Sequence, residues 1–294
     1  MAMTMHRFII ALTLAGGLSA AAVAPALSAE AAPPPRTKWT FSGPFGKFDQ
    51  AQLQRGFKVY REVCASCHAL SFVAFRNLAD PGGLGYSAAQ ATAIAAEYQI
   101  KDLDETGNPT ERPGRLADHF PKPFANDLAA QAANGGTVPP DLSTIAKART
   151  YERGFPWFVF DMVTQYQEQG PDYIHALLLG YREPPAGFKL PPGAHYNEYF
   201  PGHAIAMPKP LSDGQVTYDD GTPATLEQYS TDVTAFMMWA AEPHMMARKR
   251  IGLQVMIFLI VLAGLMYFTK KKIWHQVERP REVAAGQDPN KTTI

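Results

Sequence analysis

Two cysteines and a histidine form the segment of this chain with the clearest capacity for chemistry. Cys64 and Cys67 are the only cysteines, two residues separate them, and His68 follows the second directly. Thiols at this spacing serve three kinds of site: a redox-active dithiol, half of a tetrahedral zinc site, or the attachment point of a c-type haem.

Other sequence features distinguish these three uses. A structural zinc site needs four ligands, usually from two Cys pairs or from Cys and His pairs, and this chain has no second Cys pair and no closely spaced His pair. A thioredoxin-like dithiol lies at the start of a helix that follows a strand, whereas a helical pattern precedes this motif. Haem attachment uses all three residues, because Cys64 and Cys67 form thioether bonds and His68 binds iron.

The second axial ligand of such a haem determines its use. An open iron position suits oxygen or peroxide chemistry, and a filled position suits electron transfer. Most of the 11 methionines fall in apolar segments or helical patterns, but Met207 lies in the proline-rich stretch FPGHAIAMPKPL. This loop character favours Met207 as the second iron ligand, with the nearby His203 as its competitor. Ligation by Met and His raises the reduction potential of a haem.

Two apolar segments predict export and a membrane anchor. A basic start followed by a run rich in small apolar residues has the form of a signal peptide that ends near Ala29. The second run, IGLQVMIFLIVLAGLMYF, lies between basic clusters and spans about 27 Å as a helix, close to the roughly 30 Å hydrocarbon core of a bilayer. We therefore expect a signal peptide at 1–29, an exported haem domain at 30–247, a transmembrane anchor at 248–272 and a cytoplasmic tail at 273–294.

The remaining pattern predicts a mainly α domain with long loops. The 27 acidic and 27 basic residues leave no net charge, which argues against a nucleic-acid-binding surface. Asp49 and Gln52 have the spacing of a helix capping box, and Asp141 has the form of a cap for a turn that reaches Arg149. Helices are expected from Asp49 to the cysteine motif and at 87–98, 124–135, 157–169, 172–181 and 225–243, with irregular chain at 101–123 and 182–220.

Five segments carry a resemblance to a known family, in this order along the chain: WTFSGPFGKFDQAQLQRGFKVYREVCASCHAL, ANGGTVPPDLSTIAKAR, LLLGYREPPAGF, YFPGHAIAMPKPL and DDGTPATLEQYSTDVTAFMMWAAEPHMMARKRIGL. With these segments, and with the C-terminal apolar span, the chain resembles the cytochrome c1 family, in its bacterial form, from Trp39 to Trp274. This family comprises the haem subunit of quinol–cytochrome c reductase, the cytochrome bc1 complex. The resemblance implies a c-type cytochrome domain with long loops plus one C-terminal transmembrane helix, on the periplasmic side of the bacterial inner membrane.

The resemblance also implies roles for particular residues and partners. It implies Met207 as the axial ligand of a single covalent haem c, Arg149 as the partner of a haem propionate, and Tyr173 with Pro139 and Pro140 along the haem crevice. A guanidinium is well suited to pair with a buried carboxylate. The implied function is one-electron transfer from the Rieske iron–sulfur subunit to a soluble cytochrome c, beside cytochrome b, with no catalytic residue in this chain.

Two other functions stay open on the residues alone: a membrane-tethered haem peroxidase and a tethered c-type cytochrome of a terminal oxidase. The chain also departs from the shortest family members by insertions near 98–122 and 150–171, and it lacks an additional cysteine pair found in some bacterial relatives. An acidic rim would speed encounter with a basic cytochrome c, although a solvated surface explains the same acids. The candidates for such a rim are Asp102, Asp104, Glu105, Asp219 and Asp220.

Overall fold

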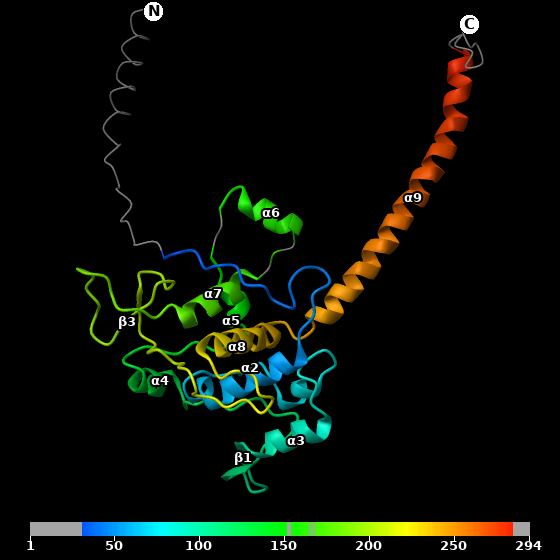
Figure 1. Ribbon diagram of the computed structural model, residues 1–294. Helices are drawn as coiled ribbons and strands as arrows, with labels where there is room; N and C mark the ends of the chain where they lie inside the picture. The colour runs from blue at the N-terminus through cyan, green and yellow to red at the C-terminus, as the bar shows by residue number, and fades with distance from the viewer. Residues whose placement is uncertain (1–30, 152–153, 165, 167, 285–294) are drawn as a thin grey trace, which may run out of the picture.

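The computed structural model describes residues 31–151, 154–164, 166 and 168–284. The expected signal peptide at 1–29 and the end of the expected tail lie outside the described residues. Within them the chain is mainly helical, as the sequence predicted (Figure 1). The helices are α2 (Gln50–Glu62), α3 (Ala88–Ala96), α4 (Asp127–Ala133), α5 (Ile145–Ala148), α6 (Trp157–Thr164), α7 (Gln169–Leu179), α8 (Leu226–Ala241) and α9 (Met245–Ala284), with two 3-10 turns, η1 (Cys64–Ser66) and η2 (Phe75–Ala79).

Two short antiparallel hairpins accompany the helices. The first pairs β1 (Gln99–Leu103) with β2 (Pro109–Pro113), and the second pairs β3 (His195–Tyr196) with β4 (Ala204–Ile205). Most of the first hairpin lies in the stretch 101–123, which the sequence predicted to be irregular, and there the prediction was wrong. Its strands are almost wholly exposed and carry no alternating apolar pattern, so periodicity could not show them. The sequence feature that could have indicated this hairpin is its turn, where the Asp104 carboxylate accepts hydrogen bonds from the amides of Thr106 (2.8 Å) and Asn108 (2.9 Å).

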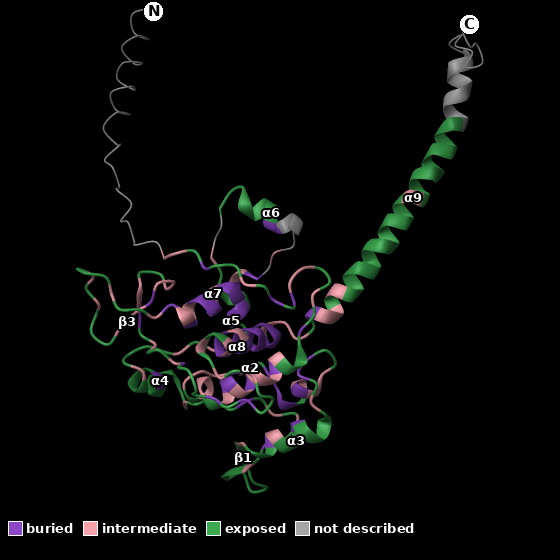
Figure 2. Cartoon of the chain, in the orientation of Figure 1, coloured by how far each residue is buried: buried purple, intermediate pink, exposed green. Residues whose placement is uncertain are grey.

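The helix that leads to the cysteine motif lies at the centre of the core. α2 packs along α8, and α5 and α7 pack against α8 from the other side; Figure 2 shows the buried residues concentrated on these elements. Asp49 caps α2 as predicted, since its carboxylate accepts a hydrogen bond from the Gln52 amide at 2.9 Å. Leu53 and Phe57 on α2 and Phe236 on α8 are almost fully buried. Burial of each such side chain stabilises the fold by about 1.5–3 kcal/mol.

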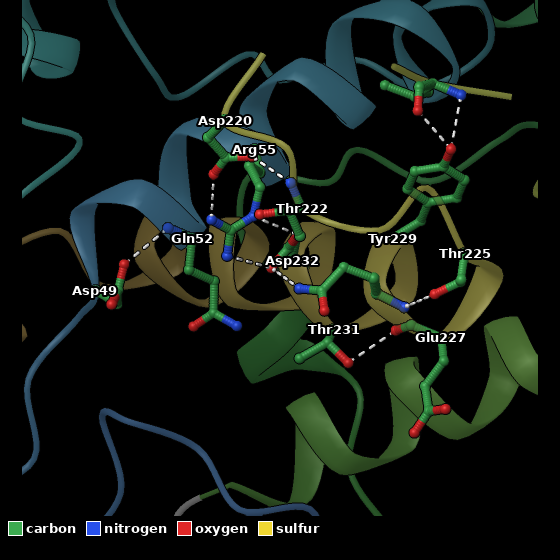
Figure 3. Close-up of polar contacts among 12 residues, drawn as sticks. Asp49, Gln52, Arg55, Asp220, Thr222, Thr225, Glu227, Tyr229, Thr231 and Asp232 are labelled. Atoms are coloured by element: carbon green, nitrogen blue, oxygen red, sulfur yellow. Dashed lines mark hydrogen bonds and ion pairs between the residues drawn. The ribbon is translucent and has the colours of Figure 1, made fainter. Parts of the chain in front are cut away.

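A glycine and an ion pair fix how closely α2 approaches α8. A Cβ atom added at Gly56 would lie 2.1 Å from the carbonyl oxygen of Asp232, so only glycine fits there. Next to it, Arg55 donates hydrogen bonds to the fully buried Asp232 (2.9 Å) and to Asp220 (2.8 Å), as Figure 3 shows. A buried carboxylate is strongly destabilising without such a partner, so Arg55 and Asp232 fix the register of the two helices.

We expect the substitution Gly56→Ala to lower the free energy of unfolding by about 1–3 kcal/mol, because the methyl group forces α2 away from α8. In an exposed helix the same change would raise stability by up to about 1 kcal/mol. Thermal unfolding followed by circular dichroism measures the difference. Gly252→Ala in α9 is the control, since a Cβ there meets no atom within 4 Å. Equal unfolding temperatures for the two variants would show that the close approach is not needed.

The second insertion also differs from its prediction. The sequence predicted a packed helix at 157–169, but α6 ends at Thr164 and α7 begins at Gln169. The apolar side chains at the start of α6 are not in the core: Trp157 is 52 % exposed and Phe160 is 56 % exposed. An apolar composition without periodicity could not distinguish a core helix from one whose apolar side is covered by something outside the chain.

The C-terminal helix leaves the domain and extends away from it (Figure 1). Its segment Met245–His275 is long and apolar enough to cross a membrane, and its most apolar window of 18 residues has no residue buried against the rest of the chain, whereas Met245 at its base is buried in the core. The expected anchor at 248–272 lies inside this segment. At its base, the Lys249 ammonium donates hydrogen bonds to the carbonyl oxygens of Phe41 and Gly43, both at 2.6 Å. These bonds join the helix to the N-terminal loop of the globular domain.

Candidate haem-binding site

The cysteine motif forms one tight turn at the end of α2. The helix ends at Glu62 with Val63 as its C-cap, and the amides of Cys67 (3.1 Å) and His68 (2.9 Å) both donate to the carbonyl oxygen of Cys64. The Tyr60 hydroxyl, one turn earlier on α2, donates to the His68 carbonyl at 3.3 Å. The two thiols and the imidazole therefore come from a single turn that the core helix holds in place.

The orientation of His68 suits an iron ligand. Its Nδ1 lies 2.8 Å from the carbonyl oxygen of Pro140. Because a carbonyl can only accept, Nδ1 carries the proton and Nε2 keeps its lone pair for a metal. Burial lowers the pKa of His68, an effect that the Pro140 carbonyl partly opposes. Haem ligands are commonly oriented in this way, by a hydrogen bond on the side of the ring that faces away from the metal.

A second set of hydrogen bonds holds the Pro140 segment against the motif. The Asp141 carboxylate accepts from the amides of Ser71 (3.1 Å) and Ser143 (2.8 Å), and the Ser143 hydroxyl accepts from the Phe72 amide at 3.0 Å. Burial works to raise the pKa of Asp141, but the bonds from Ser143 and Ser71 outweigh it and hold the pKa below its usual value. Although the N-cap of α5 is Thr144, Asp141 closes the turn just before that helix through its bond to the Ser143 amide. Its bond to Ser71 was not predicted, because contacts over 70 residues leave no local pattern.

The state of the thiols agrees with haem attachment better than with the two other uses. Both cysteines are unpaired and half-buried. Burial raises the pKa of Cys64 to about 12, and the neighbouring Cys67 adds to the shift, whereas a redox-active dithiol needs a lowered thiol pKa. Within residues 31–284, as far as they are described, no group of three or more His, Cys, Asp or Glu side chains could hold a metal ion. Two free thiols beside an oriented imidazole form the donor set that a covalent haem requires.

Met207 lies directly after the second hairpin, and a tyrosine fixes its backbone. The Tyr181 hydroxyl donates to the carbonyl oxygen of Met207 at 3.0 Å. The side chain of Met207 is half-buried. By contrast, Met237 and Met238 in α8 are 4 % and 1 % exposed and pack in the core, as their helical pattern predicted. Met207 therefore has the intermediate accessibility expected of a thioether that faces a cofactor.

The competing residue, His203, has a structural role in the same hairpin. Its backbone takes a positive φ of 58°, and its ring stacks on Tyr196 with centroids 5.4 Å apart. Its Nδ1 lies 3.1 Å from the carbonyl oxygen of Asn197. These contacts use the ring of His203 to close the hairpin that positions Met207.

Arg149 and Tyr173 lie on packed neighbours, α5 and α7. Arg149 ends α5 and is exposed, and in the described part of the chain no hydrogen bond or ion pair engages its guanidinium. Tyr173 is half-buried; burial raises its pKa, while the positive charge of Arg149 acts to lower it. This arrangement leaves a cation beside a phenol at the edge of the core, suited to an anionic group of a cofactor.

Comparison with known proteins decides the family. The model of the cytochrome C1 family matches residues 39–277. The chain belongs to the cytochrome c1 family.

Individual relatives agree with this assignment. Cytochrome b/c1 of Bradyrhizobium diazoefficiens is 64 % identical over 268 residues, which are 90 % of this chain but 39 % of that longer protein. Cytochrome c1 of Blastochloris viridis is 50 % identical over 93 % of this chain and 97 % of its own length. The mitochondrial cytochrome c1 heme protein of Kluyveromyces lactis is 47 % identical over 82 % of this chain and 76 % of its own length.

Membership of this family confirms the expected cofactor class and the kind of function. The chain is a haem c protein and an electron carrier of the cytochrome bc1 complex, not an enzyme in its own right. The apolar α9 fits attachment to a membrane.

Proposed function

We propose that Cys64 and Cys67 hold the haem through thioether bonds, with His68 and Met207 as the two iron ligands. Bound haem c supplies a reversible one-electron couple at its iron. The observation that carries the proposal is the bond between His68 Nδ1 and Pro140, which orients the imidazole for iron. Arg149 neutralises a propionate, and Tyr173 lines the crevice. With His68 and Met207 as its ligands, the iron would have no open position for oxygen or peroxide.

We further propose that this haem domain receives electrons from the Rieske iron–sulfur subunit and passes them to a soluble cytochrome c. The Pro140 carbonyl holds the imidazole of His68, and the Tyr181 hydroxyl holds the backbone of Met207. Both ligands would therefore stay in place when the haem is oxidised and reduced. Domain 30–247 then lies on the periplasmic side of the bacterial inner membrane, anchored by 248–272 beside cytochrome b. The tail, 273–294, lies in the cytoplasm.

The acidic residues considered for docking are mostly engaged within the chain. Asp219 pairs with Lys58, Asp220 with Arg55, and Asp102 with Arg112. Asp104 holds the turn of the first hairpin. These four carboxylates are therefore held by contacts within the chain, and we assign the docking of the soluble cytochrome to none of them.

Purification of the detergent-solubilised complex through a tag on this chain tests the assignment of partners. We expect a Rieske protein and cytochrome b in stoichiometric amounts. Copper-containing oxidase subunits in their place would instead support the terminal-oxidase alternative. Carbon monoxide binding to the reduced wild-type protein at neutral pH would support the peroxidase alternative, because that chemistry needs an accessible iron.

The hydroxyl of Tyr181 is expected to strengthen the bond between Met207 and iron by holding the Met207 backbone. Tyr181→Phe removes one neutral hydrogen bond, worth about 1 kcal/mol, and should therefore raise the affinity of the ferric protein for added imidazole about fivefold. A spectroscopic imidazole titration measures this change. Tyr229→Phe is the matched control, because it removes another tyrosine hydroxyl bonded to a backbone carbonyl, that of Val216. Equal imidazole affinity in Tyr181→Phe and wild type would show that the Tyr181 hydroxyl does not strengthen the bond between Met207 and iron.

A further inference from the structure

The second insertion exposes a run of aromatic side chains to the surroundings of the protein. The sequence FPWFVF, residues 155–160, contains no charged residue. An exposed apolar run of this kind on an otherwise well-packed domain usually marks a binding surface. The exposed fractions are 83 % for Phe155, 52 % for Trp157, 53 % for Phe158, 41 % for Val159 and 56 % for Phe160.

The one charged residue of α6, Asp161, faces the domain. Asp161 is only 6 % exposed, and its carboxylate lies 3.3 Å from Arg36 Nη2 and 3.3 Å from Gln169 Nε2. The guanidinium of Arg36 also lies over the ring of Tyr166, 4.1 Å from its centroid. These contacts hold α6 with its acid turned inwards and its aromatic residues outwards, the reverse of a helix on a water-facing surface.

The helix α6 and the apolar helix α9 lie towards the same side of the domain. In Figure 1, α6 projects from the domain on the side towards which α9 extends, and the hairpin β1–β2 lies on the opposite side. Figure 2 shows both helices with extensive exposed surface. Because α9 is apolar enough to cross a bilayer, the lipid surface that surrounds it faces the same side of the domain as α6.

We propose that α6 lies in the surface of the bilayer that α9 crosses, with its aromatic residues among the lipid headgroups and the first part of the acyl chains. Trp and other aromatic side chains favour this interfacial region, and short helices with an apolar side bind there in the plane of the membrane. The occupant is lipid. With α9, α6 gives the haem domain a second contact with the membrane, which restricts its rotation about the anchor.

Quenching of tryptophan fluorescence by brominated lipid tests this contact in the full-length haem-loaded protein. The chain has four tryptophans: Trp39 and Trp239 are 6 % and 1 % exposed, and Trp274 lies on α9. In a Trp274→Phe background, only Trp157 can meet lipid. We expect emission from this variant in phosphatidylcholine nanodiscs to be weaker when the acyl chains are brominated. The loss should disappear when Trp157→Phe is added and persist when Trp39→Phe is added.

The same comparison in the complete complex distinguishes lipid from a protein partner. Quenching by brominated lipid both in the isolated chain and in the complex supports the proposal. Quenching that is absent from the isolated chain, or that is lost in the complex because another subunit covers α6, overturns it. The quenching measurement does not depend on electron transfer. A negative result would therefore overturn the contact between α6 and lipid without affecting the proposed electron donor and acceptor.

Discussion

Replacement of Met207 by leucine is expected to open the haem iron. The variant should bind carbon monoxide when reduced and lose the Met-to-iron charge-transfer absorption of the ferric protein. Its reduction potential should fall by at least about 0.1 V, part of the roughly 0.8 V range that axial ligands span in haem proteins. Leucine keeps the size and apolar character of the side chain but has no sulfur donor. Visible spectroscopy with a redox titration measures both effects.

His203→Asn is the matched control for this experiment. Asparagine tolerates the positive φ of 58° at this position but cannot stack on Tyr196 as the imidazole does. We expect weaker packing of the hairpin with unchanged spectral type and no carbon monoxide binding. If His203→Asn opened the iron and Met207→Leu did not, the second ligand would be His203.

Removal of both thiols is expected to abolish covalent haem. The chain has no other cysteine, so the double variant Cys64→Ala, Cys67→Ala has no residue left for thioether bonds. After denaturing electrophoresis, haem staining should be absent from the band of this chain. A single substitution should leave one thioether bond and a shifted absorption maximum.

Ala65→Ser, between the two cysteines, is the control for this pair. It keeps the spacing and both thiols, and Ala65 is only partly buried. Its haem content should equal that of the wild type. Haem that stayed covalently bound in the double cysteine variant would contradict the attachment at this motif.

The sequence alone predicts a specific chemistry for the candidate site, for a physical reason. Thioether attachment and iron ligation require particular residue types at a fixed local spacing, and Cys64, Cys67 and His68 meet that requirement within one turn. Met207 stood out because no helical pattern accounted for it. The cap at Asp49 and the burial of Met237 and Met238 also followed from local pattern.

The groups that hold these ligands could not be predicted in the same way. The Pro140 carbonyl, the link from Asp141 to Ser71 and the Tyr181 hydroxyl act through contacts with the backbone of distant segments. Backbone acceptors have no residue type, so the sequence does not mark them. The resemblance placed Pro140 near the haem, but the hydrogen bond to His68 emerged only from the structure.

The two insertions show a different limit of prediction from sequence. The hairpin β1–β2 depends on turn chemistry rather than on alternation of apolar residues. The helix α6 was expected in the core because it is apolar, and it is exposed instead. Composition shows that a segment avoids water, but it does not show whether the protein or its surroundings cover it.

Rapid mixing of the complete complex with quinol and soluble ferricytochrome c tests the central claim most directly. The reduction state of this haem is followed by its own absorption. The account predicts that quinol reduces the haem only when the Rieske protein is present and that the soluble cytochrome c then oxidises it. Equal reduction rates in a complex without the Rieske protein, or a haem that the soluble cytochrome does not oxidise, would contradict it.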